Sequence, residues 1–567
     1  MTEEFRKMAP APLAPKPFNI SQPFETTLDN GLKVIIFEDS RFPIVSFRLA
    51  FRSGDINDPT DSKGLSTALA SMLTQGTTNR TSKEIAEETE RLGASLHASC
   101  SSDNTIISAS TLTMYSSEIL KLLAEILLTP SFPEKELSLY KENTIKGLEF
   151  QRSQADFLAD EQTSRIIFGS HPYSSVGPKA ADVENISRKK LIAHHQKTLI
   201  PNNAMLIAVG NLNRDEFLNE LDAIFKAWKA GTVETPEFDI PPPRTEKTLT
   251  IVDRVGSAQS NIVLANLAIN RTNPDYFPVI VMNQILGAGA SSRIFMNIRE
   301  DKGYTYGAYS SFDTRRLTGA FEATAEVRTV VTGDAIKEFF YELERIRDEK
   351  VLETEIEDAK NFLTGVFPIR AETQEGLTNL IVSQKLYGLP DDYLQTYRNE
   401  ISAVTIEDVQ RVANQYILPD KFALIIVGDA EEILPQAKSY AEKIEIFDTE
   451  GNLQDIAKYM ENNTEPPANV GGKWDLLLDF QGQSIPISLT LNQDADKVSG
   501  TLETMFGNGK ISTGKVKGDK VMATANAEMQ GQAVEFNING TVEGDTMKGS
   551  LTSGMIPMPL DFTGTRK

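Results

Sequence analysis

Cysteine is almost missing from this chain of 567 residues, in which Cys100 stands alone. One cysteine cannot close an intrachain disulfide, which excludes a small disulfide-stapled fold. Long apolar runs are missing as well, since no stretch approaches the roughly 18 residues of a membrane-spanning helix. We therefore expect no transmembrane segment.

The N-terminal segment MTEEFRKMAPAPLAPKPFNISQPF also lacks the apolar core of a signal peptide. Its Ala/Pro-rich part, from Met8 to Pro17, predicts an extended tether. Such a tether often follows a removed export signal. This favours a bacterial periplasm or cell envelope if a signal was removed, and the cytoplasm otherwise. The compartment stays open, because a single cysteine does not decide it.

Basic residues are in the minority, with 57 Lys and Arg against 79 Asp and Glu and a formal net charge of −22. Nucleic-acid binding needs clustered Lys and Arg to contact the phosphates, so we expect no nucleic-acid partner. A solvated acidic surface is the simpler interpretation of the charge. The composition, 40% hydrophobic and 24% charged, is typical of a soluble globular protein, and the length predicts three or four domains.

Histidine is scarce, and no two histidines are four residues apart, the spacing that places two imidazoles on one helix face for zinc. No GxSxG elbow is present, and Cys100 has only one histidine nearby. The glycine cluster Gly287-Ala288-Gly289 lacks the ending of a phosphate-binding loop and predicts a tight turn. We expect exposed or packing roles for all four histidines: His97, His171, His194 and His195.

The chain does contain an internal repeat. Residues 200–210 read IPNNAMLIAVG, and residues 418–428 read LPDKFALIIVG, a separation of 218 positions (419 − 201 = 218). A second match, between Phe168-Gly169 and Tyr387-Gly388, has a separation of 219 (387 − 168 = 219). Matches that keep nearly the same separation predict a duplicated half.

Each half predicts strands followed by helices. TTLDNGLKVIIFED and IVSFRLAFRSGD predict a hairpin or meander with a turn at Asn30-Gly31, and LTIVDRV and SNIVLANLAI take that part in the second half. Mixed strands and long helices favour an α+β fold over a doubly wound parallel sheet. Helical spacing is found at Lys63–Leu73, Ser82–Leu92, Ser117–Leu128 and Glu134–Gln154, and acidic amphipathic stretches at Arg214–Trp228 and Glu431–Ile444.

Two Pro-rich linkers, KAGTVETPEFDIPPPRTEK and a later segment with NNTEPPANVGG, divide the chain. Beyond the second linker, alternating apolar residues and a turn about every ten residues predict an all-β domain, a small barrel or sandwich. Its opening is similar to secreted-type β modules of bacterial proteins. The predicted segments are a tether (1–24), a first half-domain (25–228), a linker (229–247), a second half-domain (248–446), a linker (447–472) and a β-rich domain (473–567).

One segment of the first half carries a family resemblance. Residues 64–77, GLSTALASMLTQGT, resemble the metal-binding helix of the pitrilysin/insulinase family of zinc peptidases, which includes the mitochondrial processing peptidase. The family pattern is roughly G-L-A-H-x-x-E-H-M-L-x-x-G-T. The positions of its two histidines hold Thr67 and Ser71, and that of its catalytic glutamate holds Ala70. Six positions match the pattern: Gly64, Leu65, Met72, Leu73, Gly76 and Thr77.

These substitutions remove the chemistry that the resemblance implies. Catalytic zinc needs about three protein ligands, a water and a carboxylate that deprotonates the water. Thr67 and Ser71 are poor ligands, and Ala70 offers no base. Glu149 lies at about the distance of the family's third ligand, but one carboxylate cannot hold zinc, and a solvated helix residue is the simpler interpretation. We expect no metal, no cofactor and no catalytic residue, so that the chain alone is not an active metallopeptidase.

The second half keeps another part of the family pattern. NQILGAGASSRIFMNIREDKGYTYGAYSSF (residues 283–312) resembles the signature N-x-x-L-G…S-R-L-F…L-R-E-x-x-G-x-x-Y. In active members an arginine and a tyrosine seven positions apart reach the substrate, and Arg299 and Tyr306 match them. Guanidinium and phenol groups suit a peptide carbonyl or a developing oxyanion. A surface ion pair and a packing role are the alternatives, and the resemblance favours substrate binding.

The resemblance covers about residues 25–445 and implies a clamshell of two half-domains. It also implies that the strand after Gly93-Ala94, SLHASCSS, pairs with an extended peptide, although an ordinary sheet strand has the same pattern.

A lost zinc motif together with the retained Arg299 and Tyr306 resembles the zinc-free chain of two-component family members. This implies a non-catalytic subunit that binds and orients peptide substrate, in a heterodimer with a zinc-bearing homologous peptidase. A structural or scaffolding protein of the same fold is one alternative, with the core subunits of cytochrome bc complexes as a precedent. A stand-alone peptide-binding chamber is another.

Overall fold

The computed structural model describes residues 18–233, 236–460, 466–480, 483–504, 507–529, 532–553 and 556–567. The chain forms two compact units: Met1–Thr248, Ile262–Ala325 and Asp334–Ile425 make the first, and Leu249–Asn261, Glu326–Gly333 and Ile426–Lys567 the second. Residues 1–17 of the expected tether lie outside the described residues. The bounds of the six segments given above stay predictions.

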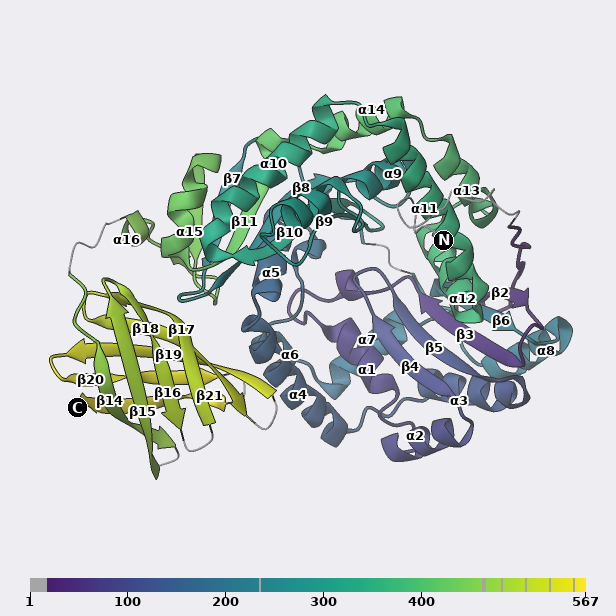
Figure 1. Cartoon of the computed structure of the whole chain (residues 1–567). Helices are drawn as coiled ribbons and strands as arrows, with labels where there is room; N and C mark the ends of the chain where they lie inside the picture. Colours follow the sequence, from purple (N-terminus) through teal and green to yellow (C-terminus); the bar gives the residue numbers. More distant parts are fainter. Residues whose placement is uncertain are drawn as a thin grey trace, which may run out of the picture. The chain divides into compact units, whose positions relative to one another are not determined.

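The first sheet has six strands in the order β1-β2-β6-β3-β5-β4 (Figure 1). β1 and β2 form the expected hairpin, with Gly31 at a φ of 91° in the turn. The alternative of a meander, in which β3 would pair with β2, is wrong, because β6 lies between them, parallel to β2 and antiparallel to β3. Every residue of β6 is buried, as a central strand requires. The strands are β1 (Phe24–Thr27), β2 (Lys33–Glu38), β3 (Ile44–Phe51), β4 (Ser95–Cys100), β5 (Thr105–Leu112) and β6 (Ala204–Gly210).

Helices of the first half cover one face of this sheet, where they share a core with alternate β3 residues such as Phe47. The ring of Phe47 stacks on Phe217 of α8 at a centroid distance of 5.5 Å. The helices are α1 (Leu65–Leu73), α2 (Ser82–Arg91), α3 (Ser116–Leu128), α4 (Glu134–Arg152), α5 (Ala155–Phe168), α6 (Ala180–Glu184), α7 (Arg188–Thr198) and α8 (Arg214–Phe225).

The second sheet repeats the order of the first. It runs β13-β12-β7-β11-β8-β10-β9, so that β7, β11, β8, β10 and β9 follow one another as β2, β6, β3, β5 and β4 do. This repeated order agrees with the predicted duplication. The strands are β7 (Thr248–Asp253), β8 (Gln259–Ala268), β9 (Ala308–Thr314), β10 (Gly319–Arg328), β11 (Ala423–Gly428), β12 (Lys443–Phe447) and β13 (Leu453–Gln454).

The helices of the second half include one that departs from expectation. The amphipathic stretch Glu431–Ile444 is helical only to Ala437, and its last residues begin β12. The helices are α9 (Tyr276–Leu286), the π-helix η6 (Phe295–Asp301), α10 (Thr332–Asp348), α11 (Glu353–Glu372), α12 (Gln374–Tyr387), α13 (Tyr393–Ala403), α14 (Ile406–Tyr416), α15 (Ala430–Ala437) and α16 (Ala457–Met460).

Helix α12 of the second half packs against β3 and β6 of the first half (Figure 1). The buried guanidinium of Arg48 in β3 pairs with Glu375 at 3.2 Å. Gln374 donates to the carbonyl of Asp39 at 3.1 Å. The first sheet is therefore covered on both faces, which explains why all but the first residue of β3 are buried.

The C-terminal β domain is a closed barrel of eight antiparallel strands, in which β14 pairs with both β15 and β21. Alternate side chains fill its interior around the fully buried Trp474. The barrel confirms the predicted all-β domain, and the sheets and helices of the two halves confirm the α+β fold class. The strands are β14 (Gly472–Phe480), β15 (Gln483–Asp494), β16 (Lys497–Thr504), β17 (Gly507–Lys517), β18 (Lys520–Met529), β19 (Gln532–Glu543), β20 (Thr546–Ser553) and β21 (Ile556–Arg566).

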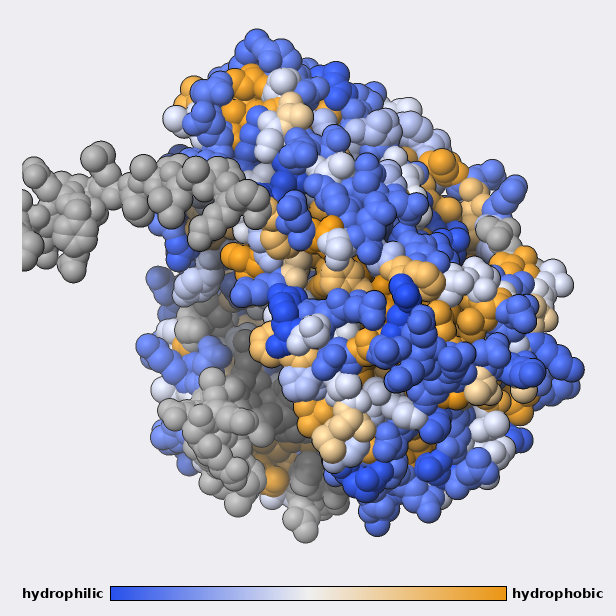
Figure 2. Space-filling view, turned by 90° about the vertical axis from the view of Figure 1, so that its right-hand side faces the viewer, coloured by the Kyte–Doolittle hydropathy of each residue, from blue (hydrophilic) through white to orange (hydrophobic). Residues whose placement is uncertain are grey.

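Among the described residues, no helix combines the length and the apolar character needed to span a membrane. On the face seen in Figure 2, hydrophilic side chains predominate and hydrophobic ones form small scattered groups.

Candidate functional site

Helix α1 carries the motif that the sequence singled out. It packs against β4, α4 and α7, and seven of its nine residues are buried. It begins after Gly64, whose φ of 78° is in the left-handed region, and a Cβ at this position would lie 2.9 Å from Pro178. The matched glycine therefore has a steric reason.

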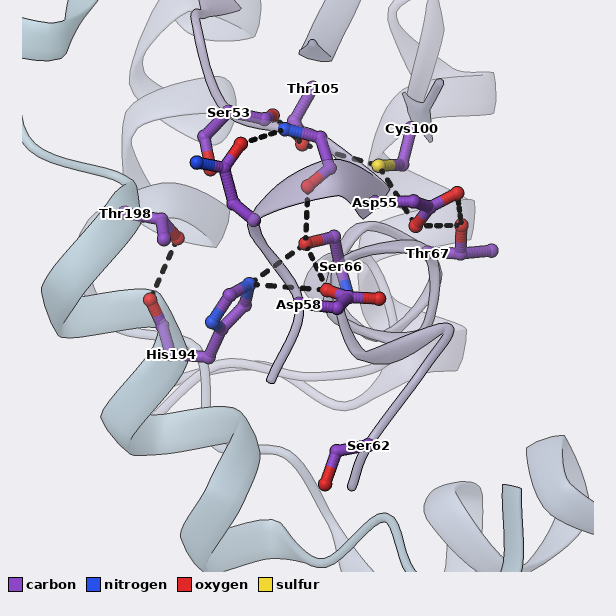
Figure 3. A network of polar contacts seen from close by, with 12 residues as sticks. Ser53, Asp55, Asp58, Ser62, Ser66, Thr67, Cys100, Thr105, His194 and Thr198 are labelled. Carbon is purple, nitrogen blue, oxygen red and sulfur yellow. Dashed lines mark hydrogen bonds and ion pairs between the residues drawn. The ribbon is translucent and has the colours of Figure 1, made fainter. Parts of the chain in front are cut away.

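In the family, three positions of this helix hold two zinc ligands and a base. In this chain, two of them hold hydroxyls that donate within the protein, and the third holds an alanine. The hydroxyl of Thr67 donates to the Asp55 carboxylate, with Oγ1 lying 2.9 Å from Oδ1 (Figure 3). Ser71 donates to the carbonyl of Thr67 at 3.0 Å. Ala70 is 2% exposed and has no polar side-chain atom.

The fourth predicted position, Glu149, does not approach these residues. A cavity of about 350 Å³ lies between α1 and α4, and the α4 residues that line it recur every three or four positions: Glu136, Leu139, Tyr140, Asn143 and Thr144. The next position on this face is Gly147, whereas Glu149 is exposed on another face. No group of three His, Cys, Asp or Glu residues suited to a metal occurs in the part of the chain that the structure describes. The residues present therefore do not fit zinc.

Beneath α1 lies a buried polar network that the sequence did not predict (Figure 3). Ser66, 2% exposed, contacts Asp58 Oδ1 at 2.6 Å and His194 Nε2 at 2.8 Å with its hydroxyl oxygen. Ser66, Asp58 and His194 lie close together, but they do not form a hydrolytic triad. Asp58 contacts the serine and not His194 Nδ1, and the serine is closed to substrate. The network instead ties the first turn of α1 to α7.

Burial controls the protonation of this network. It raises the pKa of Asp58 to about 7, and the nearby charge of Asp55 acts in the same direction. Burial also lowers the pKa of His194 to about 4, with help from Lys197 and His195. Asp58 Oδ2 is buried and has no partner among the described residues, which adds to the cost of ionising this carboxyl.

Cys100 lies beside Asp55 at the end of β4, with 3.6 Å between Sγ and Oδ1. Burial, and then the charge of Asp55, raise the pKa of its thiol well above the ordinary value. A thiol with a raised pKa has little of the thiolate form and is a poor nucleophile.

The other histidines have packing or surface positions. His195 Nε2 lies 2.6 Å from the carbonyl of Leu127, and the buried His171 accepts from the backbone N–H of Tyr173. His97 is exposed on β4. This agrees with the expectation for these three residues, while His194 has the more specific role described above.

Arg299 and Tyr306 both face solvent. Arg299 lies on η6, pairs with Glu300 and has its guanidinium carbon 5.1 Å from the centre of the Phe295 ring. Tyr306 lies in the loop between η6 and β9 and is 94% exposed, which is unusual for a large aromatic side chain. Their binding role stays a prediction, but neither side chain is buried in a packing role.

The expected peptide-binding strand, β4, is an edge strand of the first sheet. Ser95, His97 and Ser99 are exposed along it. An edge strand presents unpaired backbone groups to which an extended peptide can bind.

Comparison with protein-family models places these features in a known group. Residues 33–175 match the model described as insulinase (peptidase family M16), and residues 185–363 match the one described as peptidase M16 inactive domain. The C-terminal barrel lies outside both matched ranges.

Two bacterial proteins are similar to this chain over most of their length. A protein of Helicobacter pylori named non-peptidase homolog YmxG is 25% identical over 398 residues, which cover 67% of this chain and 88% of that protein. The uncharacterized zinc protease YmxG of Bacillus subtilis is 23% identical over 411 residues, covering 71% of this chain and 97% of that protein.

Solved structures share the fold. A peptidase M16 inactive domain from Pseudomonas fluorescens is 25% identical and superposes with a TM-score of 0.68, covering 72% of this chain and 98% of its own. A protease from Helicobacter pylori superposes with a TM-score of 0.67 at 18% identity, covering 72% of this chain and 100% of its own.

Proposed function

The chain belongs to the M16, or insulinase, family of peptidases as an inactive homologue, and from this we propose that it is the non-catalytic subunit of a heteromeric zinc peptidase. In this proposal it binds and orients a peptide for a zinc-bearing homologous subunit. The observation that carries the proposal is an asymmetry between the two halves. The first half has lost the zinc chemistry, whereas the second half presents Arg299 and Tyr306 to solvent.

The loss in the first half is chemical. Thr67 and Ser71 use their hydroxyls as donors within the protein, and Ala70 cannot act as a base. The Lewis acid and the base for peptide hydrolysis would have to come from the partner subunit.

The second half supports the binding role. A charged guanidinium and a phenol can both donate to a peptide carbonyl, and they stabilise an oxyanion most when their positions are fixed in advance. The segment just before η6, which carries Arg299, is anchored, since the buried Arg293 forms two hydrogen bonds to Glu355 of α11, at 2.7 and 2.8 Å. Tyr306 is left free to meet a ligand from outside.

Two steps test the proposal. The tagged chain is purified from its native cell, and co-eluting proteins are identified by mass spectrometry. A near-stoichiometric homologue with an intact H-x-x-E-H motif is expected. Cleavage of a fluorogenic peptide is then measured with the reconstituted pair.

The double variant Arg299→Ala, Tyr306→Ala should lower the activity of the reconstituted pair about a hundredfold. The loss of one well-placed oxyanion donor has an effect of about this size. Arg91→Ala with Tyr341→Ala is the matched control, because Arg91 and Tyr341 are also exposed, 58% for the side chain of Arg91 and 53% for Tyr341. Full activity of the Arg299/Tyr306 variant would refute the binding role. Recovery of the chain alone, or with scaffold proteins that lack the motif, would favour a structural role.

A further inference from the structure

A second cavity of about 310 Å³ lies in the first compact unit. Lys33 at the start of β2, Arg52 after the end of β3, and Arg316 in the turn between β9 and β10 all line it. Three cations therefore converge from three separate parts of the chain. Arg52 belongs to the first half and Arg316 to the second.

The described lining of this cavity is basic, whereas the whole protein is acidic. The chain has 79 acidic and 57 basic residues, yet no Asp or Glu is among the described residues that line the cavity. The remaining polar lining is supplied by asparagines, among them Asn57. Its Oδ1 accepts from the N–H of Gly54 at 3.1 Å, which leaves its amide NH₂ as a further donor.

The three cations differ in how far they are neutralised. Lys33 pairs with Glu25 at 2.8 Å, and Arg316 Nε lies 3.5 Å from Asp103, a long contact. Arg52 donates from Nη2 to the carbonyl of Lys385 at 3.0 Å, and no carboxylate pairs with it in the described part of the chain. A guanidinium has five N–H donors, so most of those on Arg52 remain available to a ligand.

Arg52 and Arg316 also repel each other. Burial lowers the pKa of Arg52, and the charge of Arg316 lowers it further. Like charges at short range are costly unless an anion lies between them. Planar guanidinium groups match the oxygen geometry of carboxylates and phosphates.

We propose that this cavity binds a small oxyanion, a carboxylate or a phosphate, between Arg52 and Arg316, with Lys33 and Asn57 as further donors. Its volume is near the lower end of the range of about 300–1,000 Å³ that is common for small-molecule sites, which suits a ligand of few atoms. A bound anion connects the two halves, because its two arginines come from different halves. The inference does not depend on a peptidase partner.

The test uses the purified full chain and isothermal titration with sodium phosphate and, separately, sodium succinate, with sodium chloride added to equal ionic strength. Saturable binding of one or both salts is expected for the wild type. Arg52→Gln and Arg316→Gln should each weaken it roughly tenfold or more, as the loss of a charge-assisted contact implies. Arg91→Gln removes one charge from an exposed helix and should leave binding unchanged.

The pattern of binding identifies the ligand. Phosphate alone assigns the site to phosphate, succinate alone assigns it to carboxylates, and binding of both assigns it to oxyanions in general. No saturable heat in the wild type overturns the proposal, and so does wild-type affinity in either arginine variant. Thermal melting establishes that each variant is folded. If one arginine variant is not folded, the other and Lys33→Gln provide the test.

Discussion

Thr67 and Ser71 show at the scale of single residues how the hydroxyls at two matched motif positions take part in the protein's internal bonding. A hydroxyl that donates to a carboxylate, as Thr67 does to Asp55, gives up its proton donor to the protein and gains no affinity for zinc. Ala70 is fully packed. Helix α1 is formed and packed in this chain, but its residues do not offer a ligand set for zinc.

Restoring the ligands tests this interpretation and the position of the fourth residue. The variant Thr67→His, Ala70→Glu, Ser71→His should retain little zinc after dialysis, because Glu149 does not face α1. Adding Gly147→Glu should raise the zinc content toward one per chain, measured by mass spectrometry of the metal. A Cβ at Gly147 meets no atom within 4 Å, so there is room for the new side chain.

The control is the triple variant with Gly147→Gln in place of Gly147→Glu, since an amide is a much weaker zinc ligand than a carboxylate. Equal zinc content with and without Gly147→Glu would mean that another carboxylate, such as Glu149 or Asp55, completes the site.

Asp58 and His194 give a second prediction, which concerns pH. The pKa of Asp58, about 7, is above the ordinary value of about 3.9, so its contribution to stability is lost as the pH rises through 4 to 7. The pKa of His194, about 4, is below the ordinary value of about 6.5, so its contribution is lost as the pH falls through that interval. The two effects oppose each other between pH 4 and 7.

Asp58→Asn removes the effect of the Asp58 carboxyl on stability and leaves that of His194. The melting temperature of the variant minus that of the wild type should therefore become more positive from pH 4.5 to pH 8, measured by scanning fluorimetry. Asp61→Asn is the control, because the Asp61 side chain is 74% exposed, and its difference should stay flat. A difference that becomes more negative with pH would show that the Asp58 anion is stabilised by the fold.

At the scale of elements, η6 is the segment whose geometry matters most for the proposed function. A π-helix is rare and is often found at functional sites. η6 carries Arg299, and its start is held by the pair between Arg293 and Glu355, whose side chains are 6% and 23% exposed.

Glu355→Ala leaves the Arg293 charge buried without its partner. It should lower the free energy of unfolding by about 3 kcal/mol, which is at the lower end for breaking a buried pair because Glu355 is partly exposed. Urea denaturation measures this loss. Glu357→Ala, on the same helix, should cost less than about 0.5 kcal/mol, as expected for a surface position. Equal losses for the two variants would mean that the pair does not anchor η6.

Elements are also the scale at which the sequence was most informative. The two repeated runs, residues 200–210 and 418–428, contain the equivalent strands β6 and β11, and helical spacing located α1 to α4 to within about two residues at each end. Apolar patterns define a strand but not its partner, so they could not show that β6 inserts between β2 and β3 from more than 150 positions away along the chain (204 − 51 = 153).

The same limit applies to the site. Ser66 and His194 meet across 128 positions, and no local pattern connects them. Glu149 differs from Gly147 by two positions, but two positions rotate a side chain by about 200° around a helix, so an approximate spacing could not place the third ligand. By contrast, Thr67, Ala70 and Ser71 could be judged from the sequence, because their chemistry does not depend on their surroundings.

At the scale of the whole molecule, the barrel has a core of its own and closed hydrogen bonding between its strands. Within the second compact unit it contacts α15 through Lys515 with Glu432, at 2.6 Å, and Lys517 with Glu431. Partly exposed pairs of this kind contribute at most about 1 kcal/mol each.

Deleting residues 466–567 should therefore leave a chain that still melts cooperatively. Its midpoint should fall by no more than about 8 °C, since at most about 2 kcal/mol is lost and 1 kcal/mol moves the midpoint of a large domain by about 2–4 °C. Calorimetry of the two chains measures the difference. The double variant Lys515→Ala, Lys517→Ala separates the ion pairs from the rest of the barrel. Loss of cooperative melting in the deletion variant would mean that the barrel is an integral part of the fold.

The two halves are bound more firmly than the barrel. Residues Leu377, Ile381 and Val382 of α12 are buried, and side chains of this size contribute about 1.5–3 kcal/mol each when fully buried. Arg48 and Gln374 add polar contacts between the halves.

A protease site inserted between Asp239 and Ile240, where Ile240 is 65% exposed, should be cut without separating the halves. The two fragments should elute together in size-exclusion chromatography at 0.15 M salt. Leu377→Asp with Ile381→Asp should separate them after cutting, because charges would then lie in the contact. Separate elution of the unsubstituted fragments would show that the linker, and not α12, holds the halves together.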